Sequence, residues 1–314
     1  MTCHNCRTEC KRKGYDRKGN QRYQCRQCSK TFLEPREDHL DGMYTSIDQA
    51  EMVLKLLLEG NSVSSVERVT GIHHTTILKL LVMTGEKCER IMAEKVKNVQ
   101  VRDLELDELW SYCGCKQRRV RPDDDPNRGD VYTFVAVERH SKLVVNIAMG
   151  KRDQRTCNAF VEGIRHATIT SPKFQITTDG FAPYRSAITT TLHDRITGYA
   201  MLIKVYRAGT EGEGRYSPAE ISSVETVPVY GQPDSERICT SIVERQNLSV
   251  RMGTRRFTRL TNAFSKKWEN HWAAVACWFA FYNFCRVHKS IRMTPAMAAG
   301  ISDHIWSVRE LLEY

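Results

Sequence analysis

Long hydrophobic runs are missing from this sequence of 314 residues. No stretch approaches the roughly 18 consecutive apolar residues that a membrane-spanning helix requires. The N-terminus, MTCHNCRTEC, also lacks the apolar segment of a secretory signal peptide. These two absences argue against a membrane protein and against a secreted one, so we expect a protein of the cytoplasm.

The lack of a secretory signal also decides how the 12 cysteines are interpreted. Four of them stand in paired C-x2-C spacing, and without an export signal a reducing compartment fits this pattern better than a disulfide framework. A thioredoxin-like redox role is disfavoured too, because no βαβ pattern follows the pairs. The cysteines further along the chain are scattered, and we interpret them as ordinary reduced thiols.

Acidic residues are in the minority, with 37 Asp and Glu against 47 Lys and Arg. The resulting net charge of +10 and a pI near 9.0 favour a polyanionic partner such as nucleic acid, through the release of counterions. DNA as the partner would place the protein at the nucleoid. The length fits roughly two domains, or one catalytic domain with small appendages.

The first motif is C-x2-C, eighteen intervening residues and a second C-x2-C. Each such turn aims two thiolates at one ion, and two turns complete the closed tetrahedral site of a structural Zn²⁺. A segment this short needs the metal to fold, which predicts a zinc ribbon over residues 1–36. His4 and Cys10 are alternative ligands. The four expected ligands are Cys3, Cys6, Cys25 and Cys28.

A helical module is predicted over residues 45–98, after a polar linker. Apolar residues recur at helical spacing over 46–59, 62–69 and 74–84, and a Thr-Gly turn precedes the last helix. This is the helix-turn-helix arrangement, whose last helix enters the DNA major groove; a packing unit without a DNA role is the alternative. A charged helical segment over 86–100 then forms a connector. The residues expected to read bases are His74, Thr75, Thr76 and Lys79.

Carboxylates occur where a buried strand is expected, in LELDELW at residues 104–110. Asp and Glu are depleted from strands and costly to bury unpaired, and metal binding would explain them. A second strand pattern ends in Asp179, and a helical pattern over 241–251 places Glu244 on one face with Asn247, Leu248 and Arg251. Oxygen donors from three elements suit Mg²⁺ or Mn²⁺, although each acid taken alone is more often a turn, cap or surface residue.

The order of the predicted elements agrees with a metal site. Three strands, a helix and a fourth strand follow one another from residue 104 to residue 178, which is the order of the ribonuclease H fold, a mixed sheet with helices. In that fold the first and fourth strands are adjacent, so Asp107 and Asp179 would be neighbours. The spacing alone does not exclude Glu105 or Glu108 in place of Asp107. Three acids at 123–125 are interpreted as solvated turn residues.

Five stretches together resemble the IS1 family of insertion-sequence transposases, and the likeness covers nearly the whole chain. They are DELW at 107–110, TTDGFAPY at 177–184, RYSPAE at 215–220, TSIVERQNLSVRMGTRRFTRLTNAFSKKWENH at 240–271 and YNFCRVHKSIRMTPAMAAG at 282–300. The zinc ribbon and the helix-turn-helix also fit this family.

The resemblance implies a DDE triad at Asp107, Asp179 and Glu244, and it selects Asp107 among the neighbouring acids. It implies an α/β multidomain protein in which a ribonuclease H-like domain over 99–300 carries an insertion at about 189–238, followed by a helical tail over 301–314. The expected activity is cleavage and transfer of DNA strands with two Mg²⁺ or Mn²⁺ ions. The expected partners are the terminal repeats of the element, target DNA and further copies of the chain, a dimer or larger.

Basic residues follow Glu244 closely, and we expect them to contact DNA phosphates. A solvated basic surface is the alternative for any one of them. His288 lies in a motif shared with transposases, but its type and position do not separate a packing role from a catalytic one. The expected phosphate contacts are Arg245, Asn247, Arg251, Arg255 and Arg256.

Two other functions remain open at this stage. One is a DNA-binding regulator that descends from such a transposase and keeps the catalytic fold only as a scaffold; the intact triad argues against it. The other is a zinc-ribbon adaptor that recruits proteins, which leaves the placed carboxylates unexplained. An adaptor would bind DNA without the steep salt dependence of many phosphate contacts.

Overall fold

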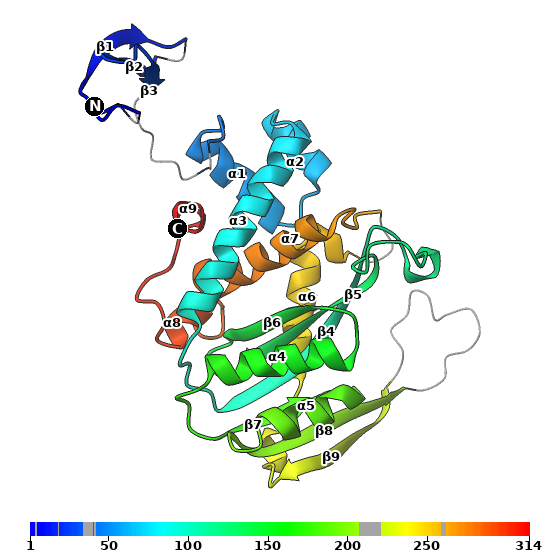
Figure 1. The fold of residues 1–314 in the computed structure, drawn as a ribbon. Coiled ribbons are helices and arrows are strands. Elements are labelled where there is room, and N and C mark those ends of the chain that lie inside the picture. Colours follow the sequence, from blue (N-terminus) through cyan, green and yellow to red (C-terminus); the bar gives the residue numbers. More distant parts are fainter. Residues whose placement is uncertain (4, 18, 34–39, 41, 207–220, 259–261) are drawn as a thin grey trace. The chain divides into compact units, whose positions relative to one another are not determined.

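The computed structural model describes residues 1–314 except 4, 18, 34–39, 41, 207–220 and 259–261 (Figure 1). Two sequence expectations fall wholly on residues outside this description, namely His4 as a ligand and the RYSPAE motif, and residues 259–261 of the stretch at 240–271 lie outside it too. The chain divides into two compact units, residues 1–44 and 45–314. Within the described residues, no helix is both long and apolar enough to cross a membrane.

The first unit is built around a three-stranded antiparallel sheet. Its strands are β1 (Cys10–Tyr15), β2 (Gln21–Cys25) and β3 (Thr31–Leu33), in the order β1-β2-β3. The cluster of buried hydrophobic side chains in this unit consists of three cysteines and Tyr23, which makes a very small core.

The second unit begins with three helices, α1 (Ile47–Leu58), α2 (Val63–Thr70) and α3 (His74–Lys95). Their starts follow the sequence: Ser46 and Ser62 each accept a hydrogen bond from a backbone N–H of the first helical turn. Gly71 ends α2 in the left-handed conformation with φ 70°, which a glycine adopts without strain. The helix, short helix, glycine turn and helix expected from the sequence are therefore all present.

α3 differs from the expectation of a helix to Thr84 followed by a separate connector. It continues through Gly85 to Lys95 as one helix of 22 residues. The reason is a close crossing with α7 (Trp268–Ala280): a Cβ placed on Gly85 would lie 2.5 Å from the Cβ of Ala273. The glycine thus marks a helix contact, not a helix end.

A six-stranded mixed sheet forms the centre of the second unit (Figure 1). β4 pairs in parallel with β7, and β7 pairs in parallel with β8, whereas the other neighbours are antiparallel. The strand order is β6-β5-β4-β7-β8-β9. The strands are β4 (Asp103–Cys113), β5 (Gly129–Glu138), β6 (Val144–Gly150), β7 (Phe174–Thr178), β8 (Ile196–Tyr206) and β9 (Ile221–Gly231).

The first five of these strands have the order and directions of the ribonuclease H fold, and the sequence predicted the first four of them. The expected insertion at about 189–238 starts too early, because it includes the end of α5 (Ala182–Thr191) and all of β8, which is a strand of the central sheet. Only β9 extends this sheet at its edge, and residues 207–220 before it lie outside the described residues.

Helices cover the sheet. α4 (Gln154–Ala167) and α5 lie across one face, and α6 (Ser241–Gly253) lies on the other (Figure 1). α7 is buried around most of its circumference, as expected for a core helix. The remaining helical segments are η1 (Gln117–Arg119), η2 (Ser235–Arg237), η3 (Arg255–Phe257), η4 (Phe281–Cys285), α8 (Pro295–Ala298) and α9 (Val308–Glu313).

The C-terminal segment is part of the second unit and not a separate tail. Arg309 of α9 forms ion pairs with Asp48 and Glu51 of α1. Lys87 of α3 donates to the carbonyl of Leu312. The helix-turn-helix and the sheet domain are therefore packed into one body, which the expected boundaries at 98 and 300 did not anticipate.

Candidate functional site

Asp107, Asp179 and Glu244 line one pocket of about 770 Å³. The sheet brings the two aspartates together. β4 and β7 run in parallel and their last paired residues are Leu106 and Thr178, so each aspartate follows the paired region by one residue. Glu244 comes from the first turn of α6, which packs on β4.

The two aspartates are held by the surrounding backbone and by one amide. Asp107 accepts hydrogen bonds from the backbone N–H of Glu108 and from the side-chain amide of Asn247, both at 2.8 Å. Asp179 accepts from the backbone N–H of Phe181 at 3.0 Å. Burial, followed by the charge of Asp179, raises the pKa of Asp107 to about 6. Burial also raises the pKa of Asp179.

Glu244 has different surroundings. Its carboxylate accepts a hydrogen bond from the hydroxyl of Thr240 at 2.6 Å and forms an ion pair with Lys204 of β8. The Glu244 side chain is half-exposed, and Arg251 lines the same pocket one helical turn beyond Asn247. Leu248, expected on this face of α6, is exposed and does not line the pocket.

Glu108 lies closer to the aspartates than the sequence suggested. Oxygen atoms of Asp107, Glu108 and Asp179 lie within 4.8 Å of one another, and Glu244 is outside this trio. Burial and the charge of Asp179 raise the pKa of Glu108 to about 8. Carboxylates are hard oxygen donors, and three of them at this separation fit Mg²⁺ or Mn²⁺.

The remaining acid of the LELDELW strand is Glu105, and it has a structural role. This carboxylate is buried and accepts hydrogen bonds from the backbone N–H groups of Ile242 at 2.8 Å and Val243 at 3.1 Å. It therefore caps the N-terminus of α6, where a negative charge is favourable. Since Glu244 belongs to the same helical turn, Glu105 fixes the position of the third acid of the pocket.

Replacing Glu105 should test this support. In Glu105→Ala two backbone N–H groups at the start of α6 lose their acceptor, and we expect unfolding free energy to fall by about 2–4 kcal/mol. Glu105→Gln, which keeps one acceptor, should lose less. Urea unfolding measures the stability, and hydrogen exchange at Ile242 and Val243 should accelerate in the alanine variant. Unchanged exchange at these two amides would show that the cap is not needed.

Sequence reasoning missed several residues of the pocket. Arg152 follows β6 in a loop, and its type and position gave no signal. Lys204 did offer one, because a lysine inside the apolar pattern ITGYAMLIKVY of β8 is as unusual as the acids of β4. Thr240 bonds to Glu244 four residues further along the chain, and its type alone gave no signal of that contact. The role of Glu105 depends on a contact with the distant start of α6, which local patterns do not contain.

The residues expected to contact phosphates differ in their exposure and in their contacts. Arg245 and Arg255 are exposed. Arg256 is half-buried, and burial lowers its pKa to about 10. Asn247 is buried, and its amide group holds Asp107. It therefore orients a carboxylate of the pocket, where the sequence suggested a phosphate contact.

The start of α3 carries the residues expected to read bases. His74 is exposed, but its backbone N–H and its ring bond to the carboxylate of Glu67 at 2.9 and 3.1 Å. The Thr75 hydroxyl lies 2.8 Å from the ring of His73. Thr76 is half-buried and Lys79 is exposed. These side chains are within reach of a ligand at the N-terminal end of the helix.

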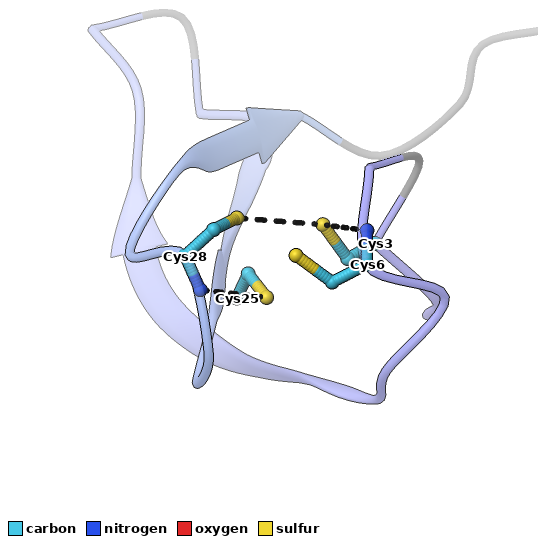
Figure 2. Close-up of side chains that lie close together, drawn as sticks. All are labelled: Cys3, Cys6, Cys25 and Cys28. Carbon is cyan, nitrogen blue, oxygen red and sulfur yellow. Dashed lines mark hydrogen bonds between the residues drawn. The ribbon is translucent and has the colours of Figure 1, made fainter.

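The first unit holds a second candidate site, a group of four cysteines on two turns (Figure 2). Their sulfur atoms lie within 4.8 Å of one another, and those of Cys3 and Cys28 are 3.7 Å apart. Tetrahedral zinc–sulfur bonds of 2.3 Å require a separation of about 3.8 Å. The backbone N–H of Cys28 lies 3.4 Å from the sulfur of Cys25, and this contact lowers the pKa of that thiol to about 6. The group is Cys3, Cys6, Cys25 and Cys28.

The donor set therefore fits a structural Zn²⁺. Cys10 packs beside Cys25 but is not one of the four, and its thiol donates to the carbonyl oxygen of Thr8 at 3.8 Å. All twelve cysteines of the chain have free thiols in the structure. A disulfide arrangement is thus not seen at either C-x2-C pair.

Comparison with known proteins adds little to this geometry. No family model and no curated protein matches the chain. A piggyBac transposase synaptic complex with hairpin DNA has 9% sequence identity and a TM-score of 0.39, over 87% of this chain and 72% of that chain. A Mos1 transposase paired-end complex with the left transposon end has 12% identity and a TM-score of 0.20, over 51% of this chain and 57% of that chain. Likeness this distant carries no argument about function, and the IS1 resemblance is not confirmed by it.

Proposed function

We propose that this chain is a DDE transposase of an insertion sequence, which cleaves and joins DNA strands with divalent metal ions. The observation that carries the proposal is that Asp107, Asp179 and Glu244 line one pocket. The pocket lies where the paired region of two central strands ends, in a sheet with ribonuclease H order. The motifs shared with the IS1 family support the insertion-sequence assignment.

The three acids would hold Mg²⁺ or Mn²⁺, which when bound neutralise charge on the phosphate and activate the attacking oxygen. The protein contributes the positions of the acids. Asn247 and the backbone orient Asp107, Thr240 orients Glu244, and Glu105 holds the start of α6. Water would first release the 3′ hydroxyl of the element, and that hydroxyl would then attack target DNA without a covalent protein intermediate.

Double-stranded DNA is the proposed partner, both as the ends of the element and as target. Exposed cations at Lys79, Arg245 and Arg255, with the net charge of +10, suit contacts with phosphates. The four-cysteine site would hold Zn²⁺ and stabilise the first unit. We infer a dimer or larger assembly, because two ends must be joined together.

The test is nicking and joining of plasmid DNA that carries the sequence flanking this gene, in the presence of Mn²⁺. The wild type should produce nicked and joined products, and Asp179→Asn should reduce them by about 10³-fold or more, because one ligand of the proposed metals loses its charge. Asp123→Asn is the matched control, since Asp123 is exposed in a loop outside the pocket and should retain full activity.

The results of this assay distinguish a transposase from a DNA-binding regulator and from an adaptor. Specific binding to the flanking sequence by the wild type and by Asp179→Asn, without cleavage by either, would favour a DNA-binding regulator. Binding that depends little on salt and on sequence would favour an adaptor. Equal cleavage by both proteins would remove Asp179 from the proposed triad.

A further inference from the structure

Arg152 places a cation in a pocket of carboxylates. It lies between the end of β6 and the start of α4, where the next residue, Asp153, caps that helix. It lines the pocket together with Asp107 and Asp179. The role of Arg152 is therefore a question about the candidate active site itself.

The guanidinium of Arg152 is held on three sides. Its Nε and Nη2 atoms donate to one oxygen of Glu108 at 3.3 and 3.2 Å. Its central carbon lies 4.1 Å from the centre of the Phe181 ring, within the range of a cation–π contact. Nη2 also lies 3.7 Å from an oxygen of Asp179. These contacts fix the plane of the guanidinium group.

Glu108 and Arg152 are unequally exposed. The side chain of Glu108 is 3% exposed, whereas that of Arg152 is 40% exposed. The glutamate is therefore the anchor, and the arginine extends from it into the pocket. Among the described residues Nη1 of Arg152 has no hydrogen-bond acceptor, so this part of the group is open to a ligand.

The other cations of the pocket have other surroundings. Lys204 is paired with Glu244, and Arg251 lies on α6. Arg152 contacts two members of the trio, Glu108 and Asp179. A planar guanidinium matches the oxygens of a phosphate, and a held one loses little freedom on binding it.

We propose that Arg152 binds a non-bridging oxygen of the phosphodiester under attack, and that Glu108 and Phe181 are positioning residues for its guanidinium. This inference rests on the proposed function and assigns a substrate contact within the same pocket. It also gives Glu108 a role other than that of a metal ligand, although it lies beside the two aspartates.

The test pairs a protein change with a change in the DNA. Wild type and Arg152→Gln are assayed in single turnover with Mn²⁺ on DNA that has either the natural phosphate or a neutral methylphosphonate at the cleaved position. On natural DNA the variant should be about 10²-fold slower, the usual effect of removing one donor to developing charge. On methylphosphonate DNA this ratio should fall to nearly one. In Ca²⁺, without turnover, Arg152→Gln should bind natural DNA more weakly than the wild type does, by a smaller factor than the loss of rate. The two proteins should bind methylphosphonate DNA almost equally.

Two further variants separate positioning from bulk charge. Arg155→Gln, a change of equal charge at an exposed position in the first turn of α4, three residues after Arg152, should leave all rates within about twofold. Glu108→Gln keeps an acceptor for Arg152 and should slow cleavage about tenfold on natural DNA, again with little effect on methylphosphonate DNA. Binding of Mn²⁺ without DNA, followed by electron paramagnetic resonance, should be unchanged or tighter in Arg152→Gln, because a cation beside the acids is removed.

Four results would overturn the inference. Equal loss of rate on both DNAs, or weaker Mn²⁺ binding by Arg152→Gln, would show that Arg152 only supports the acids. Full activity of Arg152→Gln on natural DNA would remove it from the site while leaving the transposase proposal intact. Absence of metal-dependent cleavage by the wild type would end both proposals together.

Discussion

Loss of one zinc ligand should unfold the first unit while leaving the second unit intact. In Cys28→Ser we expect zinc content to fall from about one ion per chain to nearly none, because the closed tetrahedral set is broken. Zinc contributes about 10–16 kcal/mol to the folding of such modules, far more than a core of a few side chains supplies. Hydrogen exchange should lose its protection in β1 and β2 and keep it in β4 and β7.

The matched control is Cys10→Ser. Cys10 is buried in the same unit and bonds to a carbonyl oxygen outside the group of four, so its variant should retain the metal and the protection of both strands. Elemental analysis by mass spectrometry measures the zinc. If Cys28→Ser kept one zinc ion per chain and Cys10→Ser lost it, Cys10 would replace Cys28 as the fourth ligand.

Asp107→Asn should abolish DNA cleavage and yet stabilise the metal-free protein at alkaline pH. The pKa of Asp107 in the folded protein is about 6, against an ordinary value of 3.8, and that of Glu108 is about 8. The folded state therefore binds these protons more tightly than the unfolded state does. Stability is greatest below the ordinary pKa values and falls as pH rises from about 4 to 8.

At pH 8 Asp107 is fully ionised in the wild type, and the amide of Asp107→Asn removes the cost of this buried charge. We expect this variant to be about 1–3 kcal/mol more stable than the wild type in urea at pH 8 without divalent ions, and the advantage to shrink at pH 5. Cleavage should fall by at least about 10³-fold. Asp123→Asn, in an exposed loop, should change neither quantity. A less stable Asp107→Asn protein at pH 8 would show that Asp107 is already neutralised in the fold.

Local patterns predicted much of this architecture because the relevant interactions repeat along the chain. The order of strands and helices placed Asp107 beside Asp179, since two parallel strands that start in register end in register. Paired C-x2-C spacing grouped the four cysteines that the structure brings together. In both cases the residues that meet are located by the regular geometry of a turn or a strand.

The remaining features depend on contacts between distant segments. β8 was assigned to an insertion, although its pairing with β7 makes it part of the central sheet. Glu105 resembled its neighbours Asp107 and Glu108 in the sequence, and only the packing of α6 shows that it caps a helix. Arg152 carried no signal, because its partners come from β4 and from the segment after β7.

The unbroken α3 gives the molecule a fixed length scale. Its 22 residues span about 33 Å, the length of about ten base pairs of DNA. One end of this rod presents His74 and its neighbours, and the crossing at Gly85 joins the rod to the body that holds the acidic pocket. If these residues read the element end, the packed helices fix the distance from the recognised bases to the cleaved phosphate. Moving the binding sequence by half a helical turn of DNA would then move the cleaved position by the same number of base pairs.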